Sequence, residues 1–265
     1  MPDRGSRKKV IWEYPLLASS KVHAKGSDTM FQFRTDRFFE SFPKIFASLG
    51  LTFSIVLLSI LFGSALGLML AWMKLGKNAV LKKAAFGYTT ILRCTPTLVL
   101  IFIIYYGLPK LVRSLFGIDI NDWSRFFFIV VSFSLYCGNI LSEVMRSAYE
   151  AVGKGQFEAA ATVGLTGFQA FRRIIFPQAF YISLPNVGNS LIGMLKESSL
   201  ASTIGLNEIT GTAALIIARR NGSCTLETYL ALALIYWAIC VLIEQLVKQS
   251  ENHFGRFHQP VKKEV

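Results

Sequence analysis

Residues 45–73 read IFASLGLTFSIVLLSILFGSALGLMLAWM and contain no charged side chain over 29 positions. A helix needs about 20 mostly apolar residues to cross the hydrocarbon core of a bilayer. The stretch is longer than that, so it predicts a membrane-spanning helix centred on residues 49–72. The chain is therefore expected to be an all-α membrane protein.

Four further stretches have the length and apolar composition of membrane spans. They are residues 84–107, 123–146, 174–195 and 228–247. Five transmembrane helices are therefore expected. Overall, 52% of the residues are hydrophobic and 17% are charged, whereas a soluble domain carries about 25% charged residues. Residues 198–218 have one charge, Glu208, but are rich in Ser, Thr and Gly. They predict a short helix or a re-entrant piece buried in protein, and the alternative is a sixth span.

Basic residues beside the predicted spans indicate the orientation, because short cytoplasmic loops are enriched in Lys and Arg. Twelve Lys or Arg residues lie on the side of the membrane that would hold the loop 147–173 and the C-terminal tail, and six lie on the opposite side. We therefore expect this loop and the C-terminus to be cytoplasmic and the N-terminus to be outside. The net charge of +12 fits basic loops beside acidic lipid headgroups, so membrane lipid and not nucleic acid is the expected contact.

The N-terminal region disagrees with this orientation, because residues 1–47 carry nine Lys or Arg residues. Residues 1–29 lack apolar periodicity and the apolar run of a signal peptide. They predict an extension that is either disordered or mis-annotated, with translation starting at Met30. Residues 30–47 are expected to form an interfacial amphipathic segment. The transmembrane domain is then 48–249, and 250–265 form a cytoplasmic tail.

The long loop reads GQFEAAATVGLTGFQAFRRIIFP over residues 155–177. Its Ala-rich part favours a helix with small side chains, and Gly164 can adopt the left-handed conformation that ends a helix. Thr166 and Gln169 have the spacing of a capping box, and Pro177 suits the first turn of the next helix. Two short helices with a glycine break are expected, forming a narrow ridge that can enter a groove on another protein.

The pattern E-A-A-x3-G-x9-I-x-F-P in this loop resembles the EAA loop of binding-protein-dependent ABC importer permeases. The usual form ends I-x-L-P, so Phe176 is a departure. The resemblance implies the type I (MetI-like) permease fold of five transmembrane helices, with residues 150–177 as a cytoplasmic coupling helix that docks on the ATPase. The residues implied at that contact are Glu158, Ala159, Ala160, Gly164, Arg172 and Pro177. The alternative is an amphipathic helix on the membrane surface.

Two other segments resemble the polar amino-acid subfamily of these permeases. LRCTPTLV at 92–99 is similar to its R-G-T-P-x-L segment, with Cys94 in place of Gly, and FIIYYGLP at 102–109 fits the continuation. LKESSLASTIGLNEIT at 195–210 is similar to K-[DE]-[ST]-S-L…I-G…E-[LI]-T. The resemblance extends over about residues 40–250.

This resemblance implies a permease subunit of an ATP-driven importer in the bacterial plasma (inner) membrane. The implied cargo is a polar amino acid of the His, Gln, Arg or opine type, delivered by an extracellular or periplasmic solute-binding protein. The implied partners are an ABC ATPase dimer and a second permease chain, identical or homologous. ATP and Mg would be bound by the ATPase, and no cofactor by this chain.

Polar side chains inside the predicted spans are candidates for the substrate path, because ionisable groups in hydrocarbon usually face a cavity or a partner. Arg93 lies about 15 Å into its span and could hold a substrate carboxylate bidentately. The alternative is a structural pair with an acid or with carbonyls freed by Pro96. The break at Thr95 and Pro96 exposes helix ends that can hold substrate charge.

The remaining candidates for the substrate path are Asn139, Asn186, Asn189, Lys196 and Glu197. The three Asn residues could instead bridge helices. Lys196 and Glu197 could contact the binding protein, close an outer gate or snorkel to the interface. Glu143 and Arg146 are three residues apart and are expected to form a local ion pair.

The sequence offers no catalytic constellation. It has no HExxH, no G-x-S-x-G and no phosphate-binding lysine loop, so a membrane enzyme is disfavoured and ATP hydrolysis is assigned to a separate partner. The alternative transport function is an ion-coupled secondary amino-acid transporter that acts without an ATPase. Such a protein would show inverted repeats and paired acids at mid-membrane.

Overall fold

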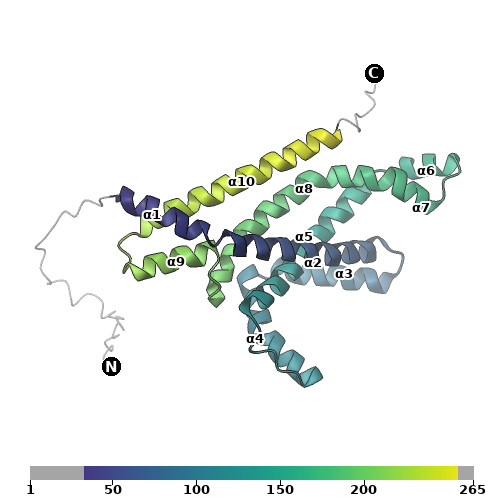
Figure 1. The fold of residues 1–265 in the computed structure, drawn as a ribbon. Helices are drawn as coiled ribbons and strands as arrows, with labels where there is room; N and C mark the ends of the chain where they lie inside the picture. The colour runs from purple at the N-terminus through teal and green to yellow at the C-terminus, as the bar shows by residue number, and fades with distance from the viewer. Residues whose placement is uncertain (1–32, 256–265) are drawn as a thin grey trace, which may run out of the picture. The chain divides into compact units, whose positions relative to one another are not determined.

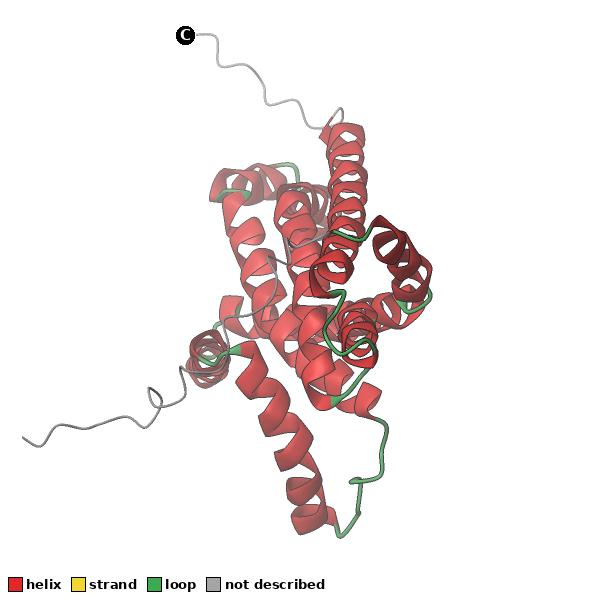
Figure 2. Ribbon diagram, turned by 90° about the vertical axis from the view of Figure 1, so that its left-hand side faces the viewer, coloured by secondary structure: helices red, strands yellow, loops and turns green. Residues whose placement is uncertain are grey.

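The computed structural model describes residues 33–255, which form helices joined by short loops, without a strand in this range (Figures 1 and 2). Residues from Arg34 onward belong to one structural unit. The predictions for residues 1–29, including a start at Met30, and those for residues 256–265 lie outside the described residues.

The helices follow one another with few intervening residues. In chain order they are α1 (Thr35–Phe46), α2 (Leu49–Leu75), α3 (Ala79–Cys94), α4 (Thr97–Phe116), α5 (Arg125–Ala151), α6 (Lys154–Thr162), α7 (Gly167–Ala170), α8 (Phe176–Glu197), α9 (Ile209–Arg219) and α10 (Thr225–Gly255). A π-helical turn, η1 (Phe171–Ile175), precedes α8, and a 3-10 segment, η2 (Ser198–Ile204), follows it. Residues 250–255 of the predicted tail thus continue α10.

Four of the described helices are long and apolar enough to cross a membrane: α2, α4, α5 and α10. The stretches Gly167–Ile204 and Ile209–Arg219 meet the same criteria together but are bent by 47° at their junction, and they bring the number to five if they count as one span. The prediction of an all-α membrane protein with the five-helix permease fold is confirmed. The short helix expected within residues 198–218 is observed as α9.

The second predicted span, residues 84–107, is wrong as a single helix. The chain leaves the helical conformation at Thr95 (φ −96°, ψ 121°) and starts a new helix after Pro96. A proline ring disfavours the helical conformation of the residue before it and supplies no N–H to the helix. The apolar span is therefore α4, while α3 packs against α2 and α5.

Glycines let α2 and α5 pack closely at the centre of the fold. A Cβ added at Gly63 would lie 2.7 Å from the Cβ of Cys137, and one added at Gly67 would lie 3.1 Å from the Cβ of Leu141. Small residues allow this close approach where lipid, and not water, surrounds the helices. Because both contacts advance by four residues, α2 and α5 run in the same direction.

The amphipathic helix α1 packs against α9 and α10. Its Ile45 is buried, whereas Phe39 and Phe46 are exposed. Glu40 contacts Lys44 and Arg220, both at 2.7 Å, and the hydrogen bond from Lys44, followed by that from Arg220, lowers the pKa of its carboxyl. The interfacial location of residues 30–47 stays a prediction.

Candidate functional site

The loop between α5 and α8 is attached to both helices by aromatic rings. The ring of Phe157 in α6 contacts Tyr149 of α5, with centroids 5.7 Å apart, and Tyr149 lies 6.5 Å from Phe171. The series continues through Phe176 to Phe180 on α8, with centroid spacings of 6.0 and 6.1 Å. The loop is thus packed against α5 and α8.

The two short helices of this loop form as the sequence predicted. Thr166 Oγ1 accepts from the N–H of Gln169, and the Gln169 side chain accepts from the N–H of Thr166, which completes the capping box. Gly164 has φ +78° and ends α6. The π-helical turn η1 then leads into α8, whose first turn contains Pro177.

The predicted coupling residues fall on different sides of this loop. Glu158, Ala159 and Arg172 are exposed, whereas Ala160 is buried. Two exposed apolar side chains near Gly164 were not predicted: Val163 and Phe168 are each 73% exposed. In Figure 1 the loop lies at the end of the unit away from α1 and α9. It therefore presents a mixed apolar and charged ridge.

A polar cavity lies at the break between α3 and α4. Its volume is about 470 Å³, within the range of about 300–1,000 Å³ that is usual for small-molecule sites. The residues that line it come from the break and from one face of α5. They are Leu92, Arg93, Thr95, Pro96, Thr97, Tyr136, Asn139, Ile140, Glu143 and Val144. The structure thus brings together four of the predicted substrate-path residues, Arg93, Thr95, Pro96 and Asn139.

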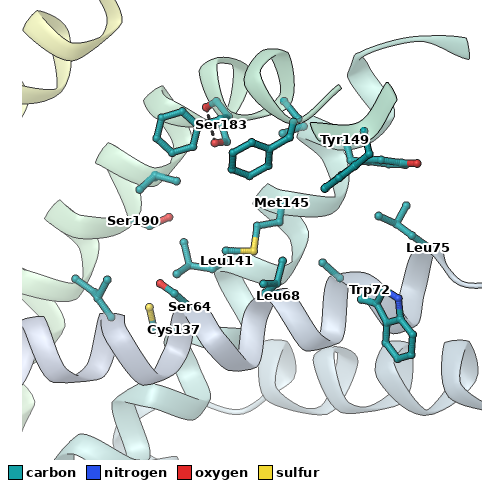
Figure 3. Close-up of a pocket in the computed structure, with 18 of the residues that line it drawn as sticks. Ser64, Leu68, Trp72, Leu75, Cys137, Leu141, Met145, Tyr149, Ser183 and Ser190 are labelled. Carbon is teal, nitrogen blue, oxygen red and sulfur yellow. Dashed lines mark hydrogen bonds between the residues drawn. The ribbon is translucent and has the colours of Figure 1, made fainter. Parts of the chain in front are cut away.

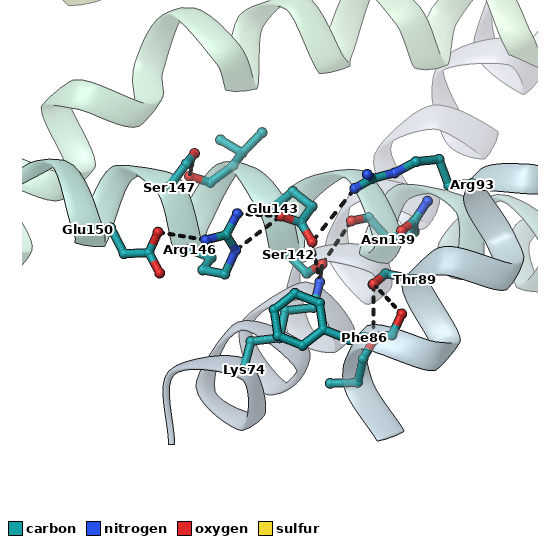
Figure 4. A network of polar contacts seen from close by, with 12 residues as sticks. Lys74, Phe86, Thr89, Arg93, Asn139, Ser142, Glu143, Arg146, Ser147 and Glu150 are labelled. Atoms are coloured by element: carbon teal, nitrogen blue, oxygen red, sulfur yellow. Dashed lines mark hydrogen bonds and ion pairs between the residues drawn. The ribbon is translucent and has the colours of Figure 1, made fainter. Parts of the chain in front are cut away.

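Glu143 is the centre of a charged cluster beside this cavity (Figure 4). Its Oε1 lies 2.7 Å from Nζ of Lys74, and its Oε2 accepts from Nη2 and Nε of Arg146 at 2.9 and 3.1 Å. Arg146 also contacts Glu150 at 2.6 Å. Arg93 is a third, more distant cation, with Nη2 3.7 Å from Oε1 of Glu143. The expected local pair between Glu143 and Arg146 is confirmed and is part of a larger network.

Lys74 is the residue that the sequence pattern did not identify. It follows the apolar run directly, where a lysine is expected to enter a loop, but its side chain is fully buried. Besides Glu143 it donates to Oγ of Ser142 at 2.9 Å and lies 5.5 Å from the ring centroid of Phe86. It therefore joins α2 and α3 to α5.

Two further buried acceptors have no hydrogen-bond partner among the described residues: Oδ1 of Asn139, a residue that lines the cavity, and Oε2 of Glu197 at the end of α8. Lys196, the neighbour of Glu197, is exposed.

The predicted residues Asn186 and Asn189 do not belong to this cavity. Both are exposed on α8, and neither is among the lining residues. A local pattern places them in a span but does not set which face of α8 packs inward. In the single chain their side chains are open to contact with water, lipid or another subunit.

A second hollow is an apolar groove of about 710 Å³ between α2, α5 and α8 (Figure 3). Trp72 and Tyr149 lie toward one end of it, and Met145 and Leu141 lie between the helices. No charged side chain lines the groove. A charged ligand would lose its hydration there without compensation, so the polar cavity is the better site for one.

Comparison with known proteins adds independent information. The family model described as "Binding-protein-dependent transport system inner membrane component" matches residues 59–255. The L-cystine transport system permease protein of Bacillus subtilis (strain 168) is 39% identical over 214 residues, which are 81% of this chain and 88% of that protein. The nopaline transport system permease protein of Agrobacterium fabrum is 36% identical over 216 residues, 80% of this chain and 88% of that protein.

A solved structure is similar as well. It is the crystal structure of an amino acid ABC transporter with histidines, with a TM-score of 0.73 and 30% sequence identity. The match covers 84% of this chain and 99% of that chain. The similarity thus extends over the spans, the loop and the polar cavity together.

Proposed function

The chain belongs to the family of inner membrane components of binding-protein-dependent transport systems, as a multi-pass permease subunit of an ABC importer, and we propose that it carries polar amino acids. The observation that carries the proposal is the polar cavity with Arg93 at the break between α3 and α4. One wall of this cavity is α5, the helix that ends at the loop. The relatives named for cystine and nopaline, and the similar amino acid transporter, support this cargo class. They favour an importer over an ion-coupled secondary transporter.

The loop of residues 150–177 is proposed as the coupling segment that docks on an ABC ATPase. Its exposed Glu158, Ala159 and Arg172 are available for the contact, Ala160 fixes the ridge, and Gly164 and Pro177 set its two ends. The aromatic contacts between α6, α5 and α8 support a rigid connection. ATP binding would close the ATPase pair, draw two such loops together and turn the path outward, and hydrolysis would reset it.

A second permease chain, identical or homologous, is proposed to complete the transport path. Four or five spans in one chain are few for enclosing a polar route, and Asn186 and Asn189 are exposed on α8 in the single chain. Lys196 and Glu197, at the end of α8 opposite the loop, would lie near the solute-binding protein. In this arrangement the loop and the C-terminus are cytoplasmic and the N-terminus is outside.

Substrate would pass the cavity that contains Arg93, Thr95, Pro96 and Asn139. A guanidinium there can hold a carboxylate with two parallel hydrogen bonds. The backbone at Thr95 and Pro96 is not helical, and such irregular backbone inside a membrane is tolerated only where it lines a cavity or is buried in protein. This supports a functional break.

Purification of the tagged chain from its native membranes in mild detergent, followed by reconstitution into liposomes, tests this function. We expect an ABC ATPase to co-purify in equal amount and amino-acid uptake to require ATP. Glu158→Arg should abolish both the co-purification and the uptake without changing the amount of chain in the membrane. Asp122→Arg, in the exposed loop before α5, is the matched control. A chain that stays alone after cross-linking, or that transports without an ATPase, would contradict the proposal.

A further inference from the structure

The apolar groove between α2, α5 and α8 is long and narrow. Its volume is about 710 Å³. On α2 its lining residues extend from Ile60 to Gly76, which is about 24 Å along the helix axis at 1.5 Å per residue. A helix of that length and about 10 Å in diameter would occupy roughly 1,900 Å³. The groove is therefore too small for a helix of a partner protein, but it can hold a thinner extended chain.

The groove is open along the membrane-spanning part of the fold. Several of its large lining side chains are exposed, namely Leu68 at 64%, Trp72 at 68%, Phe176 at 52% and Phe180 at 44%. Its lining residues carry no charge. Half of the hydrocarbon core of a bilayer is about 15 Å thick, which is less than the length of the groove. An acyl chain from one leaflet can therefore lie along it.

One end of the groove lies at the end of a membrane span. Leu75 and Gly76 line it at the C-terminal end of α2. Figure 3 shows Trp72, Leu75 and Tyr149 toward this end. Trp and Tyr are enriched where the hydrocarbon core meets the headgroups. A lipid in the groove would thus have its headgroup at this end.

Three exposed cations flank the same end. Lys77 directly follows the last groove residue of α2, and Arg172 and Arg173 directly follow the groove residue Phe171. None of the three has a hydrogen bond or an ion pair to another residue of the described range 33–255. The acid that ends the same α5 face, Glu150, is already held in an ion pair at 2.6 Å. These cations are therefore available to an anion outside the chain.

From this combination we propose that the groove binds one anionic phospholipid. An acyl chain lies between α2, α5 and α8, and Lys77 and Arg173 hold the phosphate, while Arg172 is left to the ATPase contact. A guanidinium can donate two parallel hydrogen bonds to a phosphate, and an ammonium acts as a point charge. The apolar groove beside the cations distinguishes this site from the general attraction between basic loops and acidic headgroups. Neither the cargo nor the ATPase is needed for it.

The test is quenching of Trp72 fluorescence by phospholipids that carry bromine on the acyl chain near the headgroup. The full chain, with Trp12, Trp123 and Trp237 replaced by Phe, is placed in phosphatidylcholine vesicles. Brominated phosphatidylglycerol or brominated phosphatidylcholine is then added in increasing fraction. A cation near an anionic lipid strengthens binding by about fivefold. The brominated anionic lipid should therefore reach half of its maximal quenching at a fraction at least about fivefold lower than the brominated neutral lipid.

Charge variants test the headgroup contact. Lys77→Gln combined with Arg173→Gln should bring the ratio of the two fractions close to one. The matched control is Lys82→Gln combined with Lys83→Gln, which removes two exposed cations of α3 whose chain neighbours do not line the groove. Its ratio should equal that of the parent chain, because the same number of charges is lost away from the groove.

Groove variants test the acyl-chain contact. Ala179→Phe on α8 fills the groove from one wall, and Ser64→Phe on α2 fills it from the opposite wall. Each should abolish the preference for the anionic lipid while both cations are still present. Two variants are used because a failure of one to fold leaves the other as the measurement.

The contrary outcomes are distinct from one another. Equal quenching by the two lipids in the parent chain, or an equal loss in the Lys82 and Lys83 control, would refute the site and leave only general attraction. A preference kept in both groove variants would place the lipid elsewhere. Protection of Trp72 from both lipids would mean that another protein chain covers the groove. The importer is tested separately by ATP-driven uptake, so none of these results decides the proposed function.

Discussion

Removal of Lys74 and removal of Glu143, which form an ion pair, should destabilise the chain by different amounts. At 2.7 Å and an effective dielectric constant of 20, two unit charges attract each other by about 6 kcal/mol. Removing the ammonium and the carboxylate from water costs several kcal/mol per ion, so the pair as a whole is close to neutral. The pair matters for stability because loss of one partner leaves the charge of the other partner without compensation.

Glu143→Leu leaves the fully buried Lys74 with Ser142 and the ring of Phe86 only. Breaking a buried pair in this way costs about 3–5 kcal/mol. Lys74→Met should cost less, about 1–2 kcal/mol, because Glu143 keeps Arg146 at 2.9 Å and is partly exposed. The double variant should be more stable than Glu143→Leu alone, since it contains no unpaired buried charge.

The assay is thermal unfolding of the purified chain in one detergent, followed by tryptophan fluorescence. In a chain of this size 1 kcal/mol corresponds to about 2–4 °C. We therefore expect a decrease of about 6–20 °C for Glu143→Leu, a smaller decrease for Lys74→Met, and partial recovery in the double variant. Equal decreases for the two single variants, or a double variant no better than Glu143→Leu, would refute the reasoning.

Three further results are expected from other parts of the fold. Gly63→Ala should destabilise the chain by about 1–3 kcal/mol, because its Cβ would overlap α5, whereas Gly87→Ala, which has open space, should be neutral or stabilising in the same unfolding assay. Gly164→Ala has room for a Cβ but keeps φ at +78°, so it should cost about 1–2 kcal/mol locally and lower ATPase-coupled uptake; uptake equal to wild type would exclude a need for this turn. The pKa of Glu40 is lowered, first by Lys44, so its contribution to the docking of α1 is fully present above the ordinary value of 4.5 and is lost as the pH falls through the lowered pKa. Hydrogen exchange of α1 should then increase at acidic pH in wild type and much less in Glu40→Gln.

Local sequence patterns predicted the features that local chemistry decides. The apolar run that became α2, the capping box at Thr166 and the left-handed Gly164 depend on residues a few positions apart. Pro96 was recognised as a break, but the range 84–107 was still predicted as one span. Its apolar composition continues across a backbone interruption that hydropathy does not report.

The charged cluster could not be assembled from the sequence. Lys74 and Glu143 are 69 positions apart, and they meet because α2 and α5 are parallel and packed closely at Gly63 and Gly67. The local sequence around a lysine at the end of an apolar run is the same whether its side chain points into solvent or pairs with a carboxylate on another helix. Helix rotation about its axis is equally non-local, which is why Asn139 faces the cavity and Asn186 does not.

The π-helical turn η1 affects the angle, about the helix axis, at which the loop is attached to α8. Each residue of an α-helix accounts for about 100° of rotation, and a π turn holds one residue more than the α-helical path requires. Loss of one residue within Phe171–Ile175 would restore regular α-helix and leave α6 and α8 intact. The ridge would then point in a new azimuthal direction. The fixed spacing of the E-A-A-x3-G-x9-I-x-F-P pattern runs through this turn, so it also fixes the direction in which the ridge points.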